Sequence, residues 1–337
     1  MPKQTTINQP REVLWNEPTP LEPHPRLAHH LGLSSLLVKR DDCNGLGFGG
    51  NKVRQLEYYL GEALSQSADT LLITGAVQSN FVRTAAAACA KLGLECLVQL
   101  ENRVPNTEVN YQTSGNVLLD RLFGATIHRY PHGEDEEGAD KQLNDLAEKM
   151  KAKGRAPYIV HLHPSHPPLG ALGYIDCATE LTQQLQDHSL KMPHIFVPSG
   201  SGNTHAGLLY GLRLHGDDTP VTGVCVRRDA DSQRPRLMNR FEQIRELVGG
   251  ENPVHVDDLE LDDAFLAPGY GQANAEVLDA MKLAGKLGGL VLDPVYTAKT
   301  FAALIAYAKL TPCSDLIFIH TGGGPSIFGY TDVLSKN

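Results

Sequence analysis

The sequence predicts an α/β protein of two domains, each built on an open, twisted and mostly parallel β-sheet. Short runs rich in Val, Ile and Leu alternate with helical segments, which is the pattern of parallel strands covered on both faces. The chain has 337 residues, of which 41% are apolar. Single cores stop growing at roughly 250 to 300 residues, so two smaller cores are expected rather than one large core.

The expected strands and helices follow one another along the chain. After an apolar run at 34–40, the strand and helix pairs are 69–76 with 79–93, 95–102 with 116–124, 158–164 with 170–185, and 194–200 with 204–216; 221–228 and 315–325 are further strands. Ligands of such sheets gather beyond the carboxyl ends of strands. The transitions from strand to loop that carry small or hydroxylated residues are 74–80, 161–170, 198–207 and 320–326.

Composition and charge limit the classes of molecule that the protein is expected to bind. A formal net charge of −9 and a pI near 5.8 argue against a nucleic-acid or anionic-membrane binder, because those surfaces demand basic patches. No stretch approaches the roughly 18 apolar residues of a membrane-spanning helix, and the first residues lack a signal-peptide core. We expect a cytoplasmic protein with a small-molecule substrate.

The loop at 44–51 matches the dinucleotide fingerprint G-x-G-x-x-G through Gly45, Gly47 and Gly50. A lysine, Lys52, stands two residues past the last glycine. The loop therefore serves either to bind a pyrophosphate, as in a dehydrogenase, or to deliver Lys52 to other chemistry.

A second glycine loop favours the lysine chemistry. It ends an apolar strand and opens a helix, where backbone amides and the helix dipole favour an anion. Its candidate phosphate-binding residues are Gly200, Ser201, Gly202, Asn203 and Thr204. With no G-K-[ST] motif to hold a triphosphate, this composition suits one phosphate monoester. A phosphate loop together with a lysine indicates pyridoxal phosphate (PLP), whose aldehyde requires an amine; a tight turn without a ligand is the alternative.

Six stretches together resemble the D-cysteine desulfhydrase and 1-aminocyclopropane-1-carboxylate deaminase family. They are "KRDDCNGLGFGGNKVRQLEYYLGEAL", "GAVQSNFVRTAAAACAKLGL", "PSGSGNTHAGLLYGL", "APGYGQAN", "LDPVYTAKT" and "FIHTGGGPSIFGY", and the similarity spans roughly residues 15 to 333. The resemblance implies PLP enzymes of the tryptophan synthase β-subunit fold, known as fold type II. It also implies a homodimer.

The resemblance assigns roles to individual residues. It makes Lys52 the lysine that carries the cofactor, Asn80 the partner of the cofactor's ring hydroxyl, and Ser79 a serine that meets the substrate. Tyr270 and Tyr296 match family tyrosines that face the substrate. Gln78, Ser79 and Asn80 also begin an expected helix, so their amides and polar groups suit the substrate carboxylate.

Two threonines separate the branches of the family. By resemblance, the deaminases carry a glutamate and a leucine where this chain has Thr297 and Thr321, as the desulfhydrases do. Both threonines are expected near the pyridine nitrogen of the cofactor. A carboxylate there would keep a proton on the ring and make the ring a stronger electron sink, whereas a hydroxyl leaves the ring a weaker one. Weaker delocalisation suffices when a good leaving group departs from the β-carbon, so the site is expected to perform β-elimination.

The resulting hypothesis is a PLP-dependent lyase that converts D-cysteine to pyruvate, ammonia and sulfide. Elimination from another β-substituted amino acid, such as L-cysteate, and cyclopropane ring opening are alternatives. A non-catalytic PLP-binding protein is an alternative of another class. The intact set of Lys52, Ser79, Tyr270 and Tyr296 argues against mere binding, because binding needs no nucleophilic amine beside a hydroxyl.

For the domains, we expect a large PLP-binding domain from residues 1–52 and 167–337 and a small α/β domain from 53–166, with the active site between them. The loop 161–170, "HLHPSHPPLG", departs most from the desulfhydrases. We expect Ser165 and one of His163 or His166 to reach the distal end of the substrate. A metal site from the H-x-H-x-x-H spacing is less favoured than a rigid wall of the substrate pocket, because we expect no acidic ligand near this loop.

Overall fold

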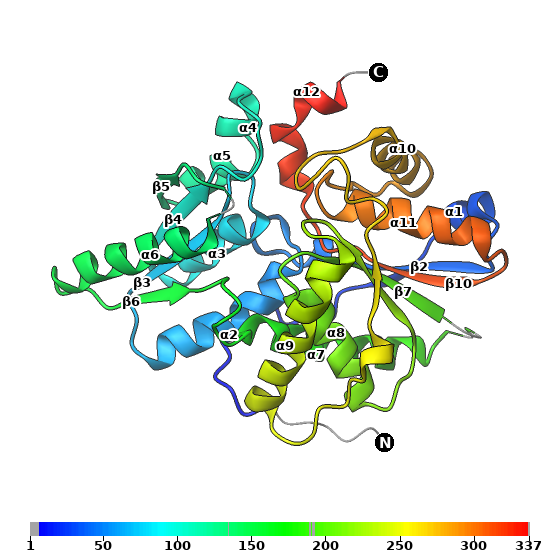
Figure 1. Ribbon diagram of the computed structural model, residues 1–337, viewed down its shortest axis with the longest axis horizontal. Helices are drawn as coiled ribbons and strands as arrows, with labels where there is room; N and C mark the ends of the chain where they lie inside the picture. Colours follow the sequence, from blue (N-terminus) through cyan, green and yellow to red (C-terminus); the bar gives the residue numbers. More distant parts are fainter. Residues whose placement is uncertain (1–6, 134, 189, 191–192, 336–337) are drawn as a thin grey trace.

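The computed structural model describes residues 7–133, 135–188, 190 and 193–335, and their strands form two sheets (Figure 1). The six-stranded sheet has the order β1 (Leu21–Pro23), β2 (Ser35–Lys39), β10 (Asp315–Ile319), β7 (Pro193–Ser199), β8 (Val221–Cys225) and β9 (Glu260–Asp262). The four-stranded sheet has the order β5 (Thr126–Tyr130), β4 (Glu95–Glu101), β3 (Thr70–Ala76) and β6 (Pro157–Val160). β1 pairs antiparallel with β2, and the other pairings are parallel. The predicted α/β class with mostly parallel sheets is confirmed.

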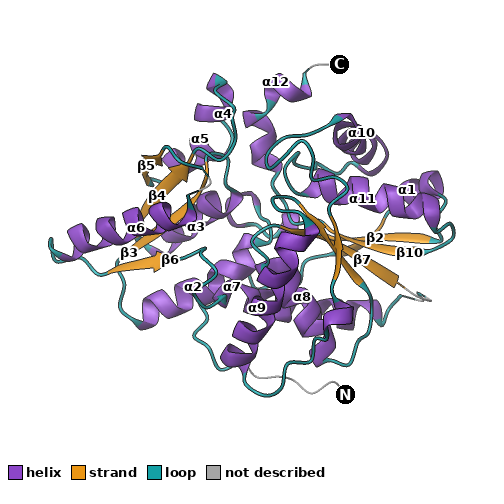
Figure 2. Cartoon of the chain, viewed as in Figure 1, coloured by secondary structure: helices purple, strands orange, loops and turns teal. Residues whose placement is uncertain are grey.

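Helices cover the sheets, as Figure 2 shows. Those of seven or more residues are α1 (Pro25–Leu31), α2 (Lys52–Ser65), α3 (Asn80–Leu92), α5 (Asn116–Leu122), α6 (Glu136–Lys151), α7 (Leu169–Leu185), α8 (Asn203–Leu214), α9 (Ala230–Val248), α10 (Ala275–Leu283) and α11 (Thr297–Leu310). Shorter elements are α4 (Val109–Thr113), α12 (Thr331–Leu334), the 3₁₀ turns η1 (Asp41–Cys43), η2 (Leu46–Phe48), η3 (Val256–Asp258) and η5 (Gly324–Gly329), and the π-turn η4 (Ala284–Gly288). Among the described residues, no helix is both long and apolar enough to cross a membrane.

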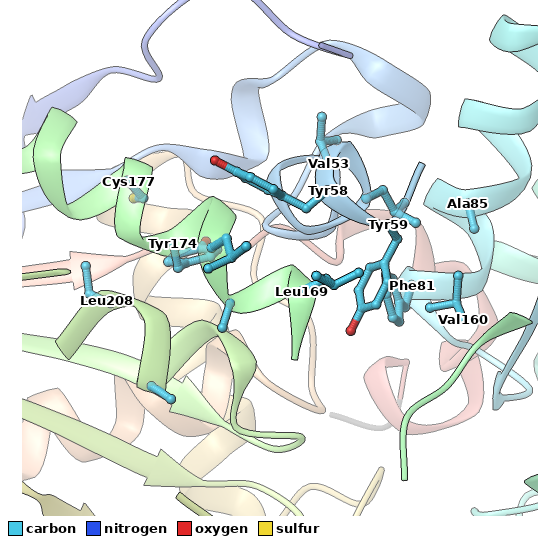
Figure 3. Packing of buried hydrophobic residues seen from close by; sticks show 14 of the residues in the cluster. Val53, Tyr58, Tyr59, Phe81, Ala85, Val160, Leu169, Tyr174, Cys177 and Leu208 are labelled. Atoms are coloured by element: carbon cyan, nitrogen blue, oxygen red, sulfur yellow. The ribbon is translucent and has the colours of Figure 1, made fainter. Parts of the chain in front are cut away.

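The largest apolar cluster runs through both halves of the molecule, where we had expected two separate cores. α2 and α7 pack against each other between the sheets, so Tyr59 and Val53 of α2 lie with Leu169 of α7 and Phe81 of α3 in one cluster (Figure 3). A second cluster fills the other face of the six-stranded sheet, beneath α1, α10 and α11. β3 is buried along its whole length, as expected of a mostly apolar parallel strand that is covered on both faces.

The division into domains stays a prediction. The strands of the four-stranded sheet all fall between residues 70 and 160, inside the segment proposed as the small domain. The shared core means that α2 and α7 join the two halves, one near each end of that segment.

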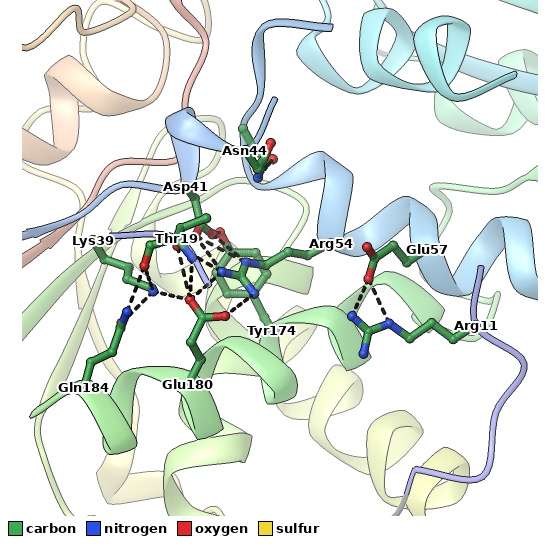
Figure 4. Close-up of polar contacts among 11 residues, drawn as sticks. Arg11, Thr19, Lys39, Asp41, Asn44, Arg54, Glu57, Tyr174, Glu180 and Gln184 are labelled. Carbon is green, nitrogen blue, oxygen red and sulfur yellow. Dashed lines mark hydrogen bonds and ion pairs between the residues drawn. The ribbon is translucent and has the colours of Figure 1, made fainter. Parts of the chain in front are cut away.

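A buried polar network anchors the first turns of α2 (Figure 4). Arg54 donates to Asp41 at 3.1 Å and to Glu180 of α7 at 2.9 Å. Lys39 is paired with Glu180 as well, and the hydroxyl of Tyr174 donates to Asp41. Although burial opposes it, the charges of Arg54 and Lys39 hold the pKa of Asp41 below its usual value. The network ties α2 to the end of β2 and to α7, two residues from Lys52.

Candidate active site

A cavity of about 900 Å³, including the solvent at its mouth, opens beyond the carboxyl ends of strands from both sheets. Residues that follow β3, β4 and β6 of one sheet, and β7, β8 and β10 of the other, line its wall. Each of the four predicted transitions from strand to loop contributes, through Ser79, Leu162, Gly200 and Thr321. This is the place at which ligands of open α/β sheets are expected.

Lys52 is the first residue of α2 and lines this cavity. Its amine lies 3.3 Å from Gln55 Oε1 and 5.0 Å from the centre of the Phe81 ring. Burial lowers the pKa of Lys52 to about 8. A lysine amine that is partly neutral at physiological pH is a competent nucleophile.

The glycine loop before Lys52 is shaped by contacts with its own chain. Gly49 has φ +65°, and a Cβ there would lie 2.2 Å from the carbonyl oxygen of Asp42. Gly50 has φ +114°, and a Cβ there would lie 2.9 Å from the carbonyl oxygen of Thr321. Close backbone packing therefore explains these glycines, and the loop delivers Lys52 to the cavity beside the last strand.

Ser79 and Asn80 line the cavity at the start of α3, whereas Gln78 does not. Ser79 is the N-cap, and its Oγ accepts from the Val82 amide at 3.2 Å, so the hydroxyl hydrogen stays available to another acceptor. Asn80 Oδ1 accepts from Asn116 at 2.9 Å. The side chain of Gln78 donates instead to the carbonyl oxygens of Tyr111 and Ser114. Its role is to hold the α4 and α5 segment against the site, which departs from the substrate contact that we expected of this side chain.

The second glycine loop opens α8 and faces the same cavity through Gly200, Ser201, Gly202 and Thr204. Asn203 is buried and does not line the cavity; its amide lies 3.4 Å from the Tyr59 hydroxyl. Gly202 has φ +99°, a conformation that favours glycine.

These residues fit the phosphate of PLP. Thr204 Oγ1 accepts from Asn51 and from Gln55, each at 2.8 Å, so its own hydrogen is left to donate to an anion at the N-terminus of α8. Gln55 contacts both Lys52 and Thr204, and so it links the amine to the phosphate loop. One amine and one anion site in the same cavity suit a single cofactor that carries an aldehyde and a phosphate.

Two tyrosines border the cavity as a pair. The hydroxyls of Tyr270 and Tyr296 lie 2.6 Å apart. Burial raises the pKa of Tyr296 well above its usual value, so this phenol stays protonated at neutral pH. In such a pair one hydroxyl donates to the other, and the acceptor keeps its own hydrogen for a further partner.

A carboxylate that sequence reasoning missed, Asp293, is hydrogen-bonded to one of the two predicted threonines, Thr297. Thr321 lines the cavity, but Thr297 does not; its hydroxyl donates to Asp293 Oδ1 at 2.7 Å. Asp293 lines the cavity, accepts from the backbone amides of residues 295–297, and has its pKa raised by burial. No helix was expected at Thr297, where α11 begins; a helix start there is the signal that could have pointed to Asp293, four residues earlier. We expected Thr297 and Thr321 alike near the pyridine nitrogen; Thr297 lies outside the cavity wall, hydrogen-bonded to Asp293, and the nearness of either threonine to the ring stays a prediction.

Four further charged residues in the wall carry no motif in the sequence. They are Arg103, Glu136, Arg227 and Arg236. Each follows a strand end or lies on a helix that covers the cleft, so only the folded chain brings them together.

The structure does not bring the predicted loop residues to the cavity; Leu162 lines it in their place. His163 and Ser165 contact each other at 2.8 Å, and Ser165 is exposed. His161 and His166 stack with ring centres 3.7 Å apart, because both contact Asp140 of α6. Our expectation that no acidic residue is near this loop is wrong. One ligand atom from each of Asp140, His161 and His166 lies within 4.8 Å of the others, so these three described residues could hold a metal ion, and the metal site that we had less favoured stays open.

Comparison with known proteins supports the assignment of the cavity as a PLP site. The sequence model described as "Pyridoxal-phosphate dependent enzyme" matches residues 14–322. D-cysteine desulfhydrases of Salmonella choleraesuis (strain SC-B67) and Salmonella typhi are each 40% identical to the chain, over 98% of this chain and 99% of theirs.

Solved structures agree with the sequence comparison. A crystal structure described as an ACC deaminase homologue has a TM-score of 0.87 and 34% identity, over 98% of this chain and 97% of that chain. An O-ureido-L-serine synthase, at 16% identity and a TM-score of 0.68 over 95% of this chain and 94% of that one, shares the fold. The predictions of the family, of an enzyme and of PLP as its cofactor are confirmed. The chain belongs to the pyridoxal-phosphate dependent enzyme family, in the branch that holds the D-cysteine desulfhydrases.

Proposed function

We propose that the chain catalyses α,β-elimination on D-cysteine, which yields pyruvate, ammonia and sulfide. The observation that carries this proposal is the buried Lys52 amine in one cavity with the Ser79 hydroxyl and the phosphate loop. The chain is 40% identical to a D-cysteine desulfhydrase over 99% of that protein, and this similarity supports the choice of D-cysteine as the substrate.

The residues present would hold PLP at two ends. Lys52 would bind its aldehyde carbon, and the loop 200–204 at the start of α8 would bind its phosphate. When bound, PLP supplies an electron sink for the negative charge that develops at the Cα atom of the substrate.

The chain itself would orient the substrate and move protons. The start of α3 would bind the substrate carboxylate through its amides, with Ser79 donating a hydrogen bond. The Lys52 amine, at a pKa of about 8, would take the Cα proton as a general base. The hydroxyl of Tyr296, which stays protonated and is hydrogen-bonded to Tyr270, would hold a proton for the departing sulfur atom.

A product assay tests this function. Wild-type holoenzyme should release equimolar pyruvate and sulfide from D-cysteine, and Lys52→Ala should lose this activity by at least about 1,000-fold. The panel should include L-cysteine and 1-aminocyclopropane-1-carboxylate, because 2-oxobutanoate from the latter would assign the chain to ring opening. Release of no keto acid from any member would favour a non-catalytic PLP-binding protein.

We also propose that the enzyme is a cytoplasmic homodimer. α4, α5 and η5 pack against one another. They carry the exposed large apolar side chains Val109, Leu118, Leu122 and Phe328. An exposed apolar patch of this kind is typical of an interaction surface.

A further inference from the structure

Outside the cavity, the fold brings one carboxylate and two imidazoles together. Asp140 lies on α6, which packs beside β6 (Figure 1), while His161 directly follows β6 and His166 lies three residues before α7. One ligand atom of each lies within 4.8 Å of those of the other two. His163, the remaining histidine of this loop, is hydrogen-bonded to Ser165 instead. The fold therefore assembles a trio that takes its acid from another element, and it leaves out one histidine of the H-x-H-x-x-H spacing.

One distance within the trio matches that between two ligands of a metal ion. Oδ1 of Asp140 lies 2.6 Å from His161 Nδ1, the length of a hydrogen bond. Its Oδ2 lies 3.5 Å from His166 Nε2, which is longer than the roughly 2.7 to 3.2 Å of a good hydrogen bond. Two ligand atoms of a tetrahedral zinc ion lie about 3.4 Å apart, because each is about 2.0 to 2.1 Å from the metal. The carboxylate and His166 are thus already at the separation of two ligands of one ion.

The two imidazole rings would have to rotate to bind the same ion. They now stack with centres 3.7 Å apart and planes 6° from parallel, so their lone pairs do not converge. The side chains of His161 and His166 are 19% and 36% exposed, which leaves both rings room to turn. The proton between His161 and Asp140 would move to the other ring nitrogen as the ion takes its place.

The loop that carries both histidines is fastened on its other side by α9. Arg240 donates to the carbonyl oxygen of His166 at 2.9 Å. Arg236 donates to the carbonyl oxygen of Leu162 at 3.3 Å and to that of Ser201, in the phosphate loop, at 3.2 Å. Because Leu162 lines the cavity, an ion that joins α6 to this loop would fix a segment of the cavity wall.

We propose that Asp140, His161 and His166 bind a divalent cation of the zinc class, which clamps α6 to the loop 161–166. Two imidazoles and one carboxylate favour Zn²⁺ over Mg²⁺ and Ca²⁺, which prefer oxygen ligands. Three protein ligands leave the fourth position of the ion to water. None of the three ligands lines the cavity, so the clamp is separate from the proposed elimination and takes no part in its chemistry.

Binding of zinc to the wild-type holoenzyme tests the site. Calorimetry with Zn²⁺ should show one ion bound tightly per chain, whereas Mg²⁺ should not bind at this site. Asp140→Asn, His161→Gln and His166→Gln should each weaken the binding of Zn²⁺ by at least about 10-fold, because each removes one ligand. The test contains no assay of turnover, because a thiol substrate would itself bind Zn²⁺.

The matched control is His163→Gln, in the same loop, which should keep the affinity for Zn²⁺ because its ring is hydrogen-bonded to Ser165. X-ray absorption at the zinc edge of the wild type needs no variant to fold, and it should show imidazole and oxygen neighbours. Sulfur neighbours would assign the ion to the exposed Cys43 or Cys313 and overturn the site. Failure of the wild type to bind Zn²⁺, or equal affinity in all three ligand variants, would also overturn it.

Hydrogen exchange tests whether the ion acts as a clamp. Zn²⁺ should slow the exchange of the backbone amides of the loop 161–166 several-fold in the wild type, because local opening of the loop would require loss of the ion. The same addition should leave the loop unchanged in Asp140→Asn and should leave the amides of α11 unchanged in both proteins. Zinc bound through the trio without slower exchange in this loop would overturn the clamp.

Discussion

Among the described residues, the buried Lys39 and Lys299 compete with the half-buried Lys52 for the role of the reactive amine, and their surroundings separate the three. Lys39 is paired with Glu180, and the amine of Lys299 donates to the carbonyl oxygens of Leu266 and Gly269 at 2.7 and 2.9 Å. Burial lowers the pKa of Lys299 to about 8, as it does for Lys52. Of the three, Lys52 lines the cavity, so position rather than basicity identifies it.

The lowered pKa of Lys52 predicts how cofactor loading depends on pH. The neutral amine attacks the aldehyde, so the rate at which cofactor-free enzyme takes up PLP should rise as pH increases through about 8. Stopped-flow absorbance at a series of pH values measures this rate. A free lysine derivative should show its rise near the ordinary value of about 10.4. A midpoint above pH 10 in the enzyme would contradict the effect of burial.

Ser79 should matter for turnover more than for stability. Ser79→Ala removes a hydroxyl that faces the substrate, and we expect kcat to fall by about 100-fold or more. It also removes an N-cap, which costs about 1 kcal/mol. Asn274→Ala, which removes the N-cap of α10 away from the cavity, should lower the unfolding free energy by a similar amount and leave kcat unchanged. Similar kcat losses in both variants would reduce Ser79 to a capping role.

At the scale of elements, three helices begin at the cavity: α2 at Lys52, α3 at Asn80 and α8 at Asn203. The starts of these helices were predictable from the sequence. Loops rich in glycine and serine that follow apolar runs indicate the end of a strand and the start of a helix. The loop 161–166 was not predictable in the same way. Its histidines point to Asp140, about twenty residues earlier, and periodicity carries no information on such a contact.

The buried network around Asp41 should set the stability of the α2 junction. In Asp41→Asn, Arg54 loses one of its two carboxylate partners, and the free energy of unfolding in urea should fall by about 3 kcal/mol at pH 7. The pKa of Asp41 is lower in the folded state, so its contribution is complete above the unfolded value near 3.8 and is lost as pH falls below it. Asp41→Asn should therefore lose less unfolding free energy than the wild type when the pH is lowered through this range.

A surface ion pair provides the comparison. Glu148→Gln breaks the ion pair between Glu148 and Lys151, whose side chains are 71% and 56% exposed. The free energy of unfolding should fall by less than about 0.5 kcal/mol. If Asp41→Asn costs no more than Glu148→Gln, the network does not anchor α2.

For the whole molecule, the sequence predicted the class, the family and the loops that meet at the cavity, since each depends on local patterns. It missed the charged wall for a physical reason. Arg103 follows β4, Arg227 follows β8 and Glu136 begins α6, so the two sheets must form and pack before these charges become neighbours. Asp293 was missed because its motif was read for the tyrosine and threonine that follow it.

The exposed apolar patch predicts the state of assembly. Light scattering at micromolar concentration should give about twice the chain mass of 36.7 kDa, and Leu122→Asp or Phe328→Asp should shift it toward one chain mass. Leu310→Asp, at the exposed end of α11, is the control and should leave the mass unchanged. A wild-type mass of 36.7 kDa would refute the homodimer.

The central claim is that Lys52 carries PLP in the cavity between the two sheets. Reduction of the holoenzyme with borohydride, followed by protease digestion and mass spectrometry, locates the lysine to which the cofactor is joined without any assay of turnover. The account predicts one modified peptide that contains Lys52, and none in Lys52→Ala. Modification of Lys299, the other lysine with a pKa lowered to about 8, would contradict it.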